Sequence, residues 1–158
     1  MVPTVYIETT VISYLTAWPS RDLVRAAHQQ ITREWWESRR PGFSLYASQL
    51  VLNEAASGYP KAAADRLQIL AAFPLLEFRP PTLALAESLE RALQLPYHAR
   101  ADALHVAVCA ANGIDYLLTW NCRHLANATL APKIERACLA HGLVSPRIVT
   151  PEQLLEEP

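Results

Sequence analysis

The sequence lacks the motifs that mark several common classes of protein. Its three cysteines, Cys109, Cys122 and Cys138, are an odd number, with no CxxC motif and no Cys/His pair at zinc spacing. We therefore expect reduced thiols rather than a disulfide framework or a structural zinc site. The chain also has no G-x-x-x-x-G-K-[ST] phosphate loop and no G-x-S-x-G elbow. These absences argue against P-loop nucleotide binding and serine-hydrolase chemistry.

Charge is scarce as well, and no hydrophobic run is long. Charged residues make up 18% of the chain and the formal net charge is -1, so any contact with nucleic acid would need a local basic patch. No run approaches the ~18 apolar residues of a membrane span. The first residues show no basic region followed by an apolar stretch and a small-residue cleavage site. We therefore expect a cytoplasmic protein that has no membrane partner.

What the sequence does contain is an alternation of strand and helix patterns. With 158 residues and 51% hydrophobic composition, one domain spanning 1–158 is expected. Strands are predicted at 4–7, 43–46, 75–78 and 116–119, with a possible edge strand at 148–149. Helices are predicted near 11–15, 23–38, 49–57, 61–72, 81–95, 100–112 and 130–141, and from Pro151 on. The alternation predicts an α/β fold in which helices cover both faces of a parallel sheet.

Four polar side chains stand out against this pattern. Glu8 directly follows the first predicted strand, and Asn121 lies just past the strand at 116–119. Ligand sites in such folds lie at the carboxyl ends of the strands. Glu54 and Asp102 each lie early in a helix, among apolar or small residues. Three converging carboxylates would repel one another without a cation, and they suit a hard divalent ion such as Mg²⁺ or Mn²⁺.

Each carboxylate also has a purely structural interpretation. Glu8 is consistent with an exposed charge at a helix N-terminus, and Asp102 with a charge near a helix start, both favoured by the helix dipole. Glu54 is consistent with a solvated position on a helix. Only the combination of the three supports a functional hypothesis.

The motifs, taken in order, resemble those of PIN-domain ribonucleases, especially the VapC-type toxins of toxin–antitoxin pairs. The segments that carry the resemblance are "YIETTVISYL", "SQLVLNEAASG" and "RADALHVAVCAANGIDYLLTW", and it extends from Val5 to about the last helix. It implies a three-layer α/β/α sandwich with a mostly parallel central sheet, a Mg²⁺ or Mn²⁺ pocket and hydrolysis of RNA phosphodiester bonds. It also implies a homodimer and an antitoxin protein as partners.

The resemblance assigns the metal ligands and exposes two departures from the family pattern. Glu8, Glu54 and Asp102 fall at the first, second and third acidic positions. The first position is usually Asp, which is one methylene shorter than Glu8. Where the family commonly has further acidic residues, this chain has Asn121 and His124. We expect a less negative pocket that holds one ion tightly, or acquires a second only with substrate.

The resemblance implies a distinct role for each candidate residue. Glu8 and Asp102 are expected to be ligands, Glu54 a ligand or the group that orients the attacking water, and Asn121 a neutral positioning residue. Thr10 falls where the family has a hydroxyl that supports the pocket, with a helix N-cap as the alternative.

Two loop residues and one histidine have open interpretations. Arg123 and His124 are candidates for contacts with the RNA backbone, or are solvated loop residues. His105, one helical turn after Asp102, is either a packed or surface histidine or a contact to phosphate or water. Cys109 lies in an apolar helix and is expected to be a core residue.

A basic and aromatic segment offers a further surface. Arg33, Arg39 and Arg40 lie close to Trp35 and Trp36, a composition that suits stacking on single-stranded RNA. The same residues are explained by a long amphipathic helix that buries one tryptophan or presents it to a partner.

Three functions compete on this evidence. The preferred one is a metal-dependent ribonuclease, the toxin of a toxin–antitoxin pair. The alternative is a catalytically weak or inactive PIN-like protein that binds RNA or regulates, which the changes at Glu8 and Asn121 favour. A small phosphatase of the haloacid-dehalogenase type ranks last, because it needs Asp-x-Asp after the first strand and this chain has Glu8-Thr9-Thr10.

Overall fold

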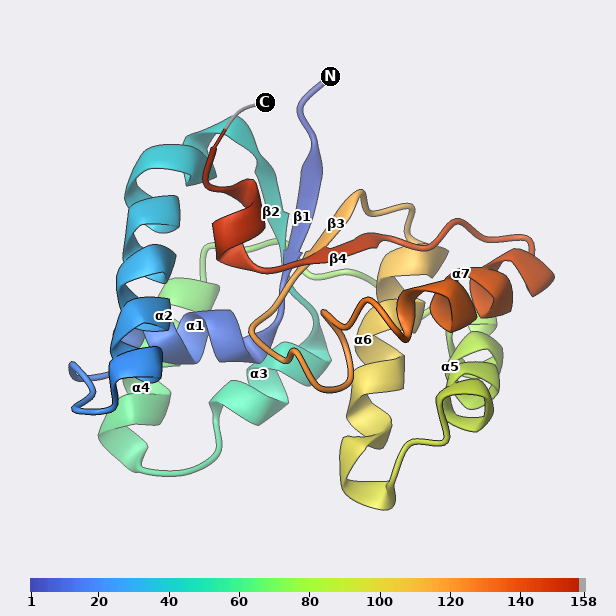
Figure 1. Cartoon of the computed structure of the whole chain (residues 1–158), viewed down its shortest axis with the longest axis horizontal. Helices are drawn as coiled ribbons and strands as arrows, with labels where there is room; N and C mark the ends of the chain where they lie inside the picture. Colours follow the sequence, from blue (N-terminus) through green and yellow to red (C-terminus); the bar gives the residue numbers. More distant parts are fainter. Residues whose placement is uncertain (157–158) are drawn as a thin grey trace.

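The protein, described here by a computed structural model over residues 1–156, has a parallel sheet flanked by helices (Figure 1). The strands are β1 (Thr4–Ile7), β2 (Ser44–Tyr46), β3 (Tyr116–Leu118) and β4 (Arg147–Val149). The α-helices are α1 (Thr9–Thr16), α2 (Leu23–Glu34), α3 (Gln49–Ala55), α4 (Pro60–Leu70), α5 (Pro80–Leu93), α6 (Arg100–Ala111) and α7 (Ala131–Ala140). One π-helical turn, Trp35–Arg39, continues α2, and short 3-10 turns lie at Arg40–Gly42, Tyr97–Ala99 and Pro151–Leu154.

The sheet order creates a crevice between its two central strands. The order is β2-β1-β3-β4, and every pair is parallel. From β1 the chain proceeds outward to β2, whereas from β3 it proceeds outward to β4 on the other side. The carboxyl ends of β1 and β3 therefore form a topological switch point, where α/β sheets bind their ligands.

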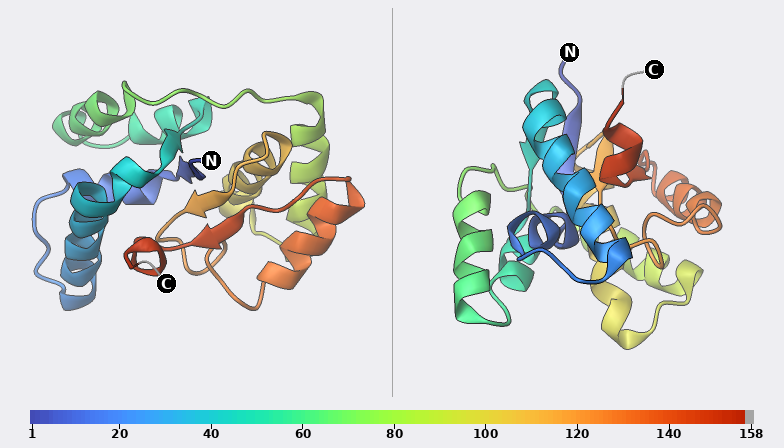
Figure 2. Two further views of the ribbon diagram at one scale, coloured as in Figure 1. Left: turned by 90° about the horizontal axis from the view of Figure 1, so that it is seen from above. Right: turned by 60° about the vertical axis from the view of Figure 1, so that its left-hand side comes forward.

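The sheet is packed on both faces, which gives the three-layer α/β/α arrangement. Successive side chains of a strand point to opposite faces. Tyr6 points to the face covered by α6, because its hydroxyl bonds to His105 of that helix. Val5 and Ile7 consequently point to the other face, and all three are fully buried. The two views of Figure 2 show α2 and α6 on opposite sides of the strands.

Helix α6 is the most deeply buried helix next to the site. It packs closely against α5, and residues from Ala103 to Ala110 are buried with the exception of Leu104. Such a helix is apolar around most of its circumference because neighbours cover it on several sides. It ends where Gly113 adopts a positive φ of 66°, as is common at helix C-termini. A polar side chain on the buried part of α6, such as that of His105, must therefore find its partners inside the protein.

The predicted α/β fold is confirmed, and so are four of the five predicted strands. The strand predicted at 75–78 is wrong: Leu75 forms only an isolated parallel bridge with Ala47. The neighbouring strand β2 ends at Tyr46, and Ser48 already caps α3 by accepting from the Val51 amide at 3.4 Å. A longer strand at 75–78 would therefore have no partner residues.

None of the helices within residues 1–156 combines the length and the apolar composition that a membrane span requires.

Candidate metal centre

The candidate site is built on the converging ends of β1 and β3. The Glu8 amide donates to the carbonyl of Leu118 at 3.0 Å, so the residue that follows β1 is fixed beside the end of β3. Thr119 comes next in the chain, and its hydroxyl donates to Oε2 of Glu8 at 2.8 Å. The site thus begins at the crevice that the sheet order predicts.

Glu8 is a buried N-cap whose two carboxylate oxygens have different surroundings. It caps α1, and Oε2 accepts from the Thr10 amide at 3.1 Å and from the hydroxyls of Thr10 and Thr119. Among the described residues, none donates a hydrogen bond to Oε1. Only 4% of the residue is exposed, and burial raises the pKa of Glu8 even though these hydrogen bonds oppose the shift. The carboxylate therefore has one oxygen fixed by the protein and one available.

Glu54, in the last turn of α3, shows the same asymmetry. Its Oε1 accepts from the Thr9 hydroxyl at 2.6 Å and from His105 Nε2 at 2.8 Å, while no described residue donates to Oε2. Burial opposes ionisation, but the bonds from His105 and Thr9 prevail and lower the pKa of Glu54. Glu54 is thus held ionised, with one free oxygen.

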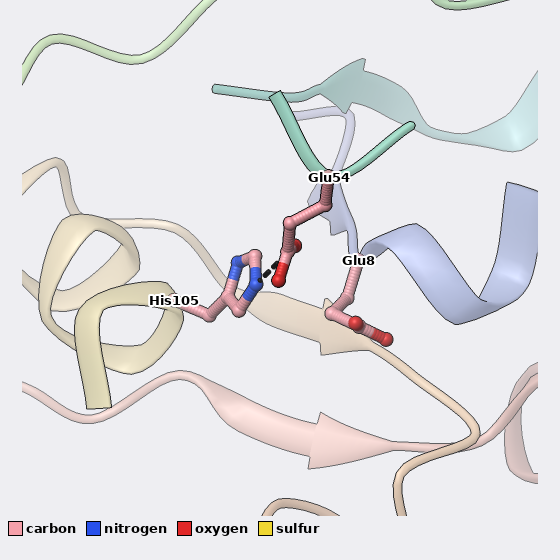
Figure 3. Close-up of side chains that lie close together, drawn as sticks. All are labelled: Glu8, Glu54 and His105. Carbon is pink, nitrogen blue, oxygen red and sulfur yellow. Dashed lines mark hydrogen bonds and ion pairs between the residues drawn. The ribbon is translucent and has the colours of Figure 1, made fainter. Parts of the chain in front are cut away.

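Glu8, Glu54 and His105 form one cluster (Figure 3). Each offers a potential ligand atom, and the three atoms lie within 4.8 Å of one another. In the close-up the His105 ring and the Glu54 carboxylate face one another, and Glu8 lies beside them. The three residues come from elements that are distant in sequence: α6, α3 and the end of β1. Two carboxylates and an imidazole at this separation are compatible with a single divalent cation.

His105 is fully buried and bonded through both ring nitrogens. Nε2 faces Glu54, and Nδ1 lies 2.7 Å from the Tyr6 hydroxyl, which in turn lies 2.8 Å from Ser48 Oγ. Burial alone would lower the pKa of His105, but its bond to Glu54 and the charges of the surrounding carboxylates raise it.

Asp102 lies in a second group, one helical turn before His105 on α6. Its Oδ2 accepts from Asn121 Nδ2 at 3.1 Å and lies 3.2 Å from His124 Nδ1. The amide oxygen of Asn121 accepts from the His124 backbone N–H at 3.0 Å. Burial raises the pKa of Asp102, against the opposing effects of Asn121, His105 and His124. Helix α6 links the two groups, because it carries both Asp102 and His105.

The structure therefore brings Glu8 and Glu54 together with His105, and places Asp102 outside this cluster, in a group with Asn121 and His124. Glu8 is not the exposed helix charge of the alternative interpretation, because it is buried. Thr10 supports the Glu8 carboxylate, while the N-cap position belongs to Glu8 itself. Arg123 is exposed and directs no side-chain hydrogen bond into either group.

Sequence reasoning missed the partners that hold these carboxylates. Thr9 and Thr119 supply hydroxyls to Glu54 and Glu8, and Tyr6 supplies one to His105. The sequence indicates these hydroxyl partners only weakly, through Tyr6, which occupies a strand position where a purely apolar residue is usual. His105 could be placed near Asp102 by its i+3 spacing, but nothing in the sequence indicated its bond to Glu54.

The basic and aromatic segment lies elsewhere and is partly internal. Trp35 is fully buried against Phe43, so the interpretation in which the helix buries one tryptophan is confirmed for it. Trp36 is half-buried, with the Arg40 guanidinium 4.4 Å from its ring centre.

The three cysteines are all free, as expected, and burial raises the pKa of Cys109 well above the usual range.

Comparison with known proteins agrees with this geometry. The PIN domain family model matches residues 5–129, which span β1 to the loop before α7 and include every residue of both groups. No curated protein matches the chain significantly. Since the matched segment covers well over half of the chain, the protein belongs to the PIN domain family.

Proposed function

We propose that the protein is a divalent-metal-dependent ribonuclease that hydrolyses RNA phosphodiester bonds. One observation carries the proposal: in a chain of the PIN family, buried Glu8 meets Glu54 at the sheet's switch point, and each presents an oxygen that no described residue occupies. A buried carboxylate without a cationic partner is costly, as the raised pKa of Glu8 reflects. A bound cation would remove that cost.

The donor set fits Mg²⁺ or Mn²⁺. Both ions prefer oxygen ligands and commonly use one or two carboxylates, with water and substrate phosphate completing the shell. Glu8 and Glu54 would hold the ion, with Asp102 as a third ligand, directly or through water. When bound, such an ion supplies positive charge to the scissile phosphate and makes an attacking water more acidic.

The surrounding residues keep the carboxylates in place. Hydroxyls of Thr9, Thr10 and Thr119 hold one oxygen of each glutamate and so orient the other. Asn121 and His124 do the same for Asp102, leaving Oδ1 without a donor among the described residues. Asn121 uses both its amide atoms in these bonds, which supports a positioning role rather than a ligand role.

The finer assignment is to a VapC-type toxin that acts in the cytoplasm, as a homodimer bound by an antitoxin. It rests on the resemblance of the three motifs, beginning with the "YIETTVISYL" segment. Arg123 is exposed next to the Asp102 group, where its charge is available to an RNA phosphate.

The test is cleavage of a mixed RNA pool with Mg²⁺ or Mn²⁺ by the natural chain and by Asp102→Asn. Because Oδ1 of Asp102 has no donor, an amide NH₂ can occupy its place while the other oxygen keeps its bonds. We expect cleavage to fall by about 10²-fold or more, with the fold retained. Glu87→Gln, a change to an exposed carboxylate on α5, is the matched control and should leave cleavage unchanged. Equal cleavage by Asp102→Asn would exclude Asp102 from the site.

A second candidate is a PIN protein that binds RNA with little or no catalysis. Asn121 favours it, because a neutral residue stands where the family commonly has a carboxylate, and its oxygen is already bonded to His124. This candidate predicts RNA binding with no metal-dependent cleavage of any RNA in the pool.

A further inference from the structure

The buried histidine that contacts Glu54 is not explained by cation binding alone. Three potential ligands meet in the cluster, and the simplest interpretation makes His105 one of them. However, His105 is fully buried and both of its nitrogens are already bonded, Nε2 to Glu54 and Nδ1 to Tyr6. A nitrogen can bind a cation only through a free lone pair, so the protonation of each nitrogen decides the question.

The partners of the ring determine where its protons lie. An ionised carboxylate only accepts hydrogen bonds, so Nε2 must carry the proton shared with Glu54 Oε1. In the neutral ring, Nδ1 then accepts from the Tyr6 hydroxyl, which accepts in turn from Ser48 Oγ. In the charged ring, Nδ1 donates to Tyr6 and Tyr6 donates to Ser48. In both forms neither nitrogen has a lone pair for a cation.

We propose that His105 is a positioning residue that acts through Glu54: with Thr9 it holds Oε1 of Glu54, so that Oε2 is presented to a divalent cation, and it is not itself a ligand. Tyr6 and Ser48 support this role by fixing the orientation of the ring. The inference rests on the proposed metal-dependent function, but it concerns ion binding, which is measurable without RNA.

The buried setting makes this arrangement rigid. His105 lies on α6, Glu54 on α3, and Tyr6 on the central strand β1, so the chain of hydrogen bonds connects three elements around the crevice. Residues that orient a metal ligand from behind typically affect ion affinity by about 10- to 100-fold when removed.

The first experiment measures Mn²⁺ affinity of the full chain by titration calorimetry. His105→Leu removes the donor to Glu54 and should weaken binding about 10- to 100-fold. His105→Gln places an amide N–H near the position of Nε2 and should recover most of the affinity. Because the leucine substitution could destabilise the core, Thr9→Val gives an independent variant: it removes the other donor to the same oxygen and should weaken binding by about 10-fold or less. Unchanged affinity in Thr9→Val and in folded His105→Leu would overturn the proposal.

Matched controls separate this effect from general destabilisation. Thr16→Val removes a hydroxyl from the other end of α1, where within residues 1–156 it bonds only to the Ile12 carbonyl. Tyr6→Phe removes the support of Nδ1, and Tyr14→Phe is its control on α1. We expect weaker Mn²⁺ binding in Tyr6→Phe and natural affinity in both controls. Equal losses in Thr16→Val and Thr9→Val would contradict a role through Glu54.

The second experiment follows the ring nitrogens directly. In the ¹⁵N-labelled natural chain, Nε2 of His105 should remain protonated both without metal and with saturating Mg²⁺. Loss of that proton on adding Mg²⁺ would show that His105 is a ligand and would overturn the proposal. RNA cleavage measured in parallel keeps the two claims apart. Mn²⁺ binding with the predicted variant pattern but no cleavage would refute only the ribonuclease function, and absence of Mn²⁺ binding would refute both.

Discussion

Replacing Glu8 with glutamine should stabilise the metal-free protein while abolishing its ion binding. Oε2 of Glu8 accepts all three hydrogen bonds made to the side chain, and Oε1 accepts none from the described residues. A glutamine can therefore keep these bonds through its amide oxygen and place its NH₂ at the free position. Neutral acceptors form weaker bonds than charged ones, by about 1 kcal/mol each or less.

Burial of the Glu8 charge acts against these hydrogen bonds, and the direction of the pKa shift of Glu8 indicates which of the two effects is larger. Burial raises the pKa of Glu8 although Thr10, Thr119 and His105 all act to lower it. Loss of the charge should therefore stabilise the fold by a net amount of about 0.5–2 kcal/mol, the usual size of a single stabilising substitution. For a domain of this size, each kcal/mol corresponds to a rise in Tm of about 2–4 °C.

The contribution of Glu8 to the stability of the natural chain should fall as the pH rises. Because the pKa of Glu8 is higher in the folded than in the unfolded state, stability is fully present below the ordinary value of 4.5 and is lost as the pH rises through the folded pKa. Glu8→Gln lacks this loss. Below this pH both side chains are neutral, so the two proteins should melt alike in acid and diverge above about pH 4.5.

Thermal melting in EDTA and in Mg²⁺ tests the argument. In EDTA at pH 7, Glu8→Gln should melt above the natural chain. Mg²⁺ at 100 times its Kd should stabilise the natural chain by about 2.7 kcal/mol and leave the variant unchanged. Glu87→Gln should behave as the natural chain in both. A Glu8→Gln variant that melts lower than the natural chain in EDTA would refute the reasoning, since it would mean that the hydrogen bonds of the carboxylate outweigh its burial.

Three further substitutions probe the site and the fold around it. Glu8→Asp restores the family's usual residue: higher cleavage of RNA would mean that Glu8 is a weakened ligand, and a loss would mean that the pocket is adapted to the longer side chain. In the natural chain the buried Trp120 Nε1 donates to Thr32 Oγ1 at 2.8 Å. Thr32→Val removes this acceptor and should lower the free energy of unfolding, measured in urea, by about 1–3 kcal/mol. Gly113→Ala meets no steric contact but forces a φ of 66°, and should cost about 1 kcal/mol in the same assay; no loss would contradict the observed C-cap.

The fold was largely predictable because local patterns determine most of its elements. β-Branched and aromatic residues mark β1, and Ser48 marks the start of α3. The strand predicted at 75–78 is wrong because a strand needs a partner along its length. Between the end of β2 and the start of α3, only Ala47 pairs with Leu75 among the described residues. Patterns within a segment carry no information about such a limit.

The place of Glu8 at the end of β1 could be predicted from the sequence, but the contacts among the candidate site residues could not. The strand-end rule located Glu8, because a charged residue after a buried strand has few other places to lie. The bond between His105 and Tyr6 joins residues 99 positions apart, and a lone histidine in an apolar helix is usually explained by packing. The grouping of Asp102 with Asn121 and His124 depends on the rotation of α6 against the sheet, which spacing along one helix does not determine.

Anomalous diffraction from crystals of the full chain grown with Mn²⁺ tests most directly whether the acidic side chains converge on one ion. We expect a peak between the free oxygens of Glu8 and Glu54, with Asp102 bound directly or through water and His105 still bonded to Glu54. A peak at another place on the protein, or no peak at a Mn²⁺ concentration that supports cleavage, would contradict this expectation.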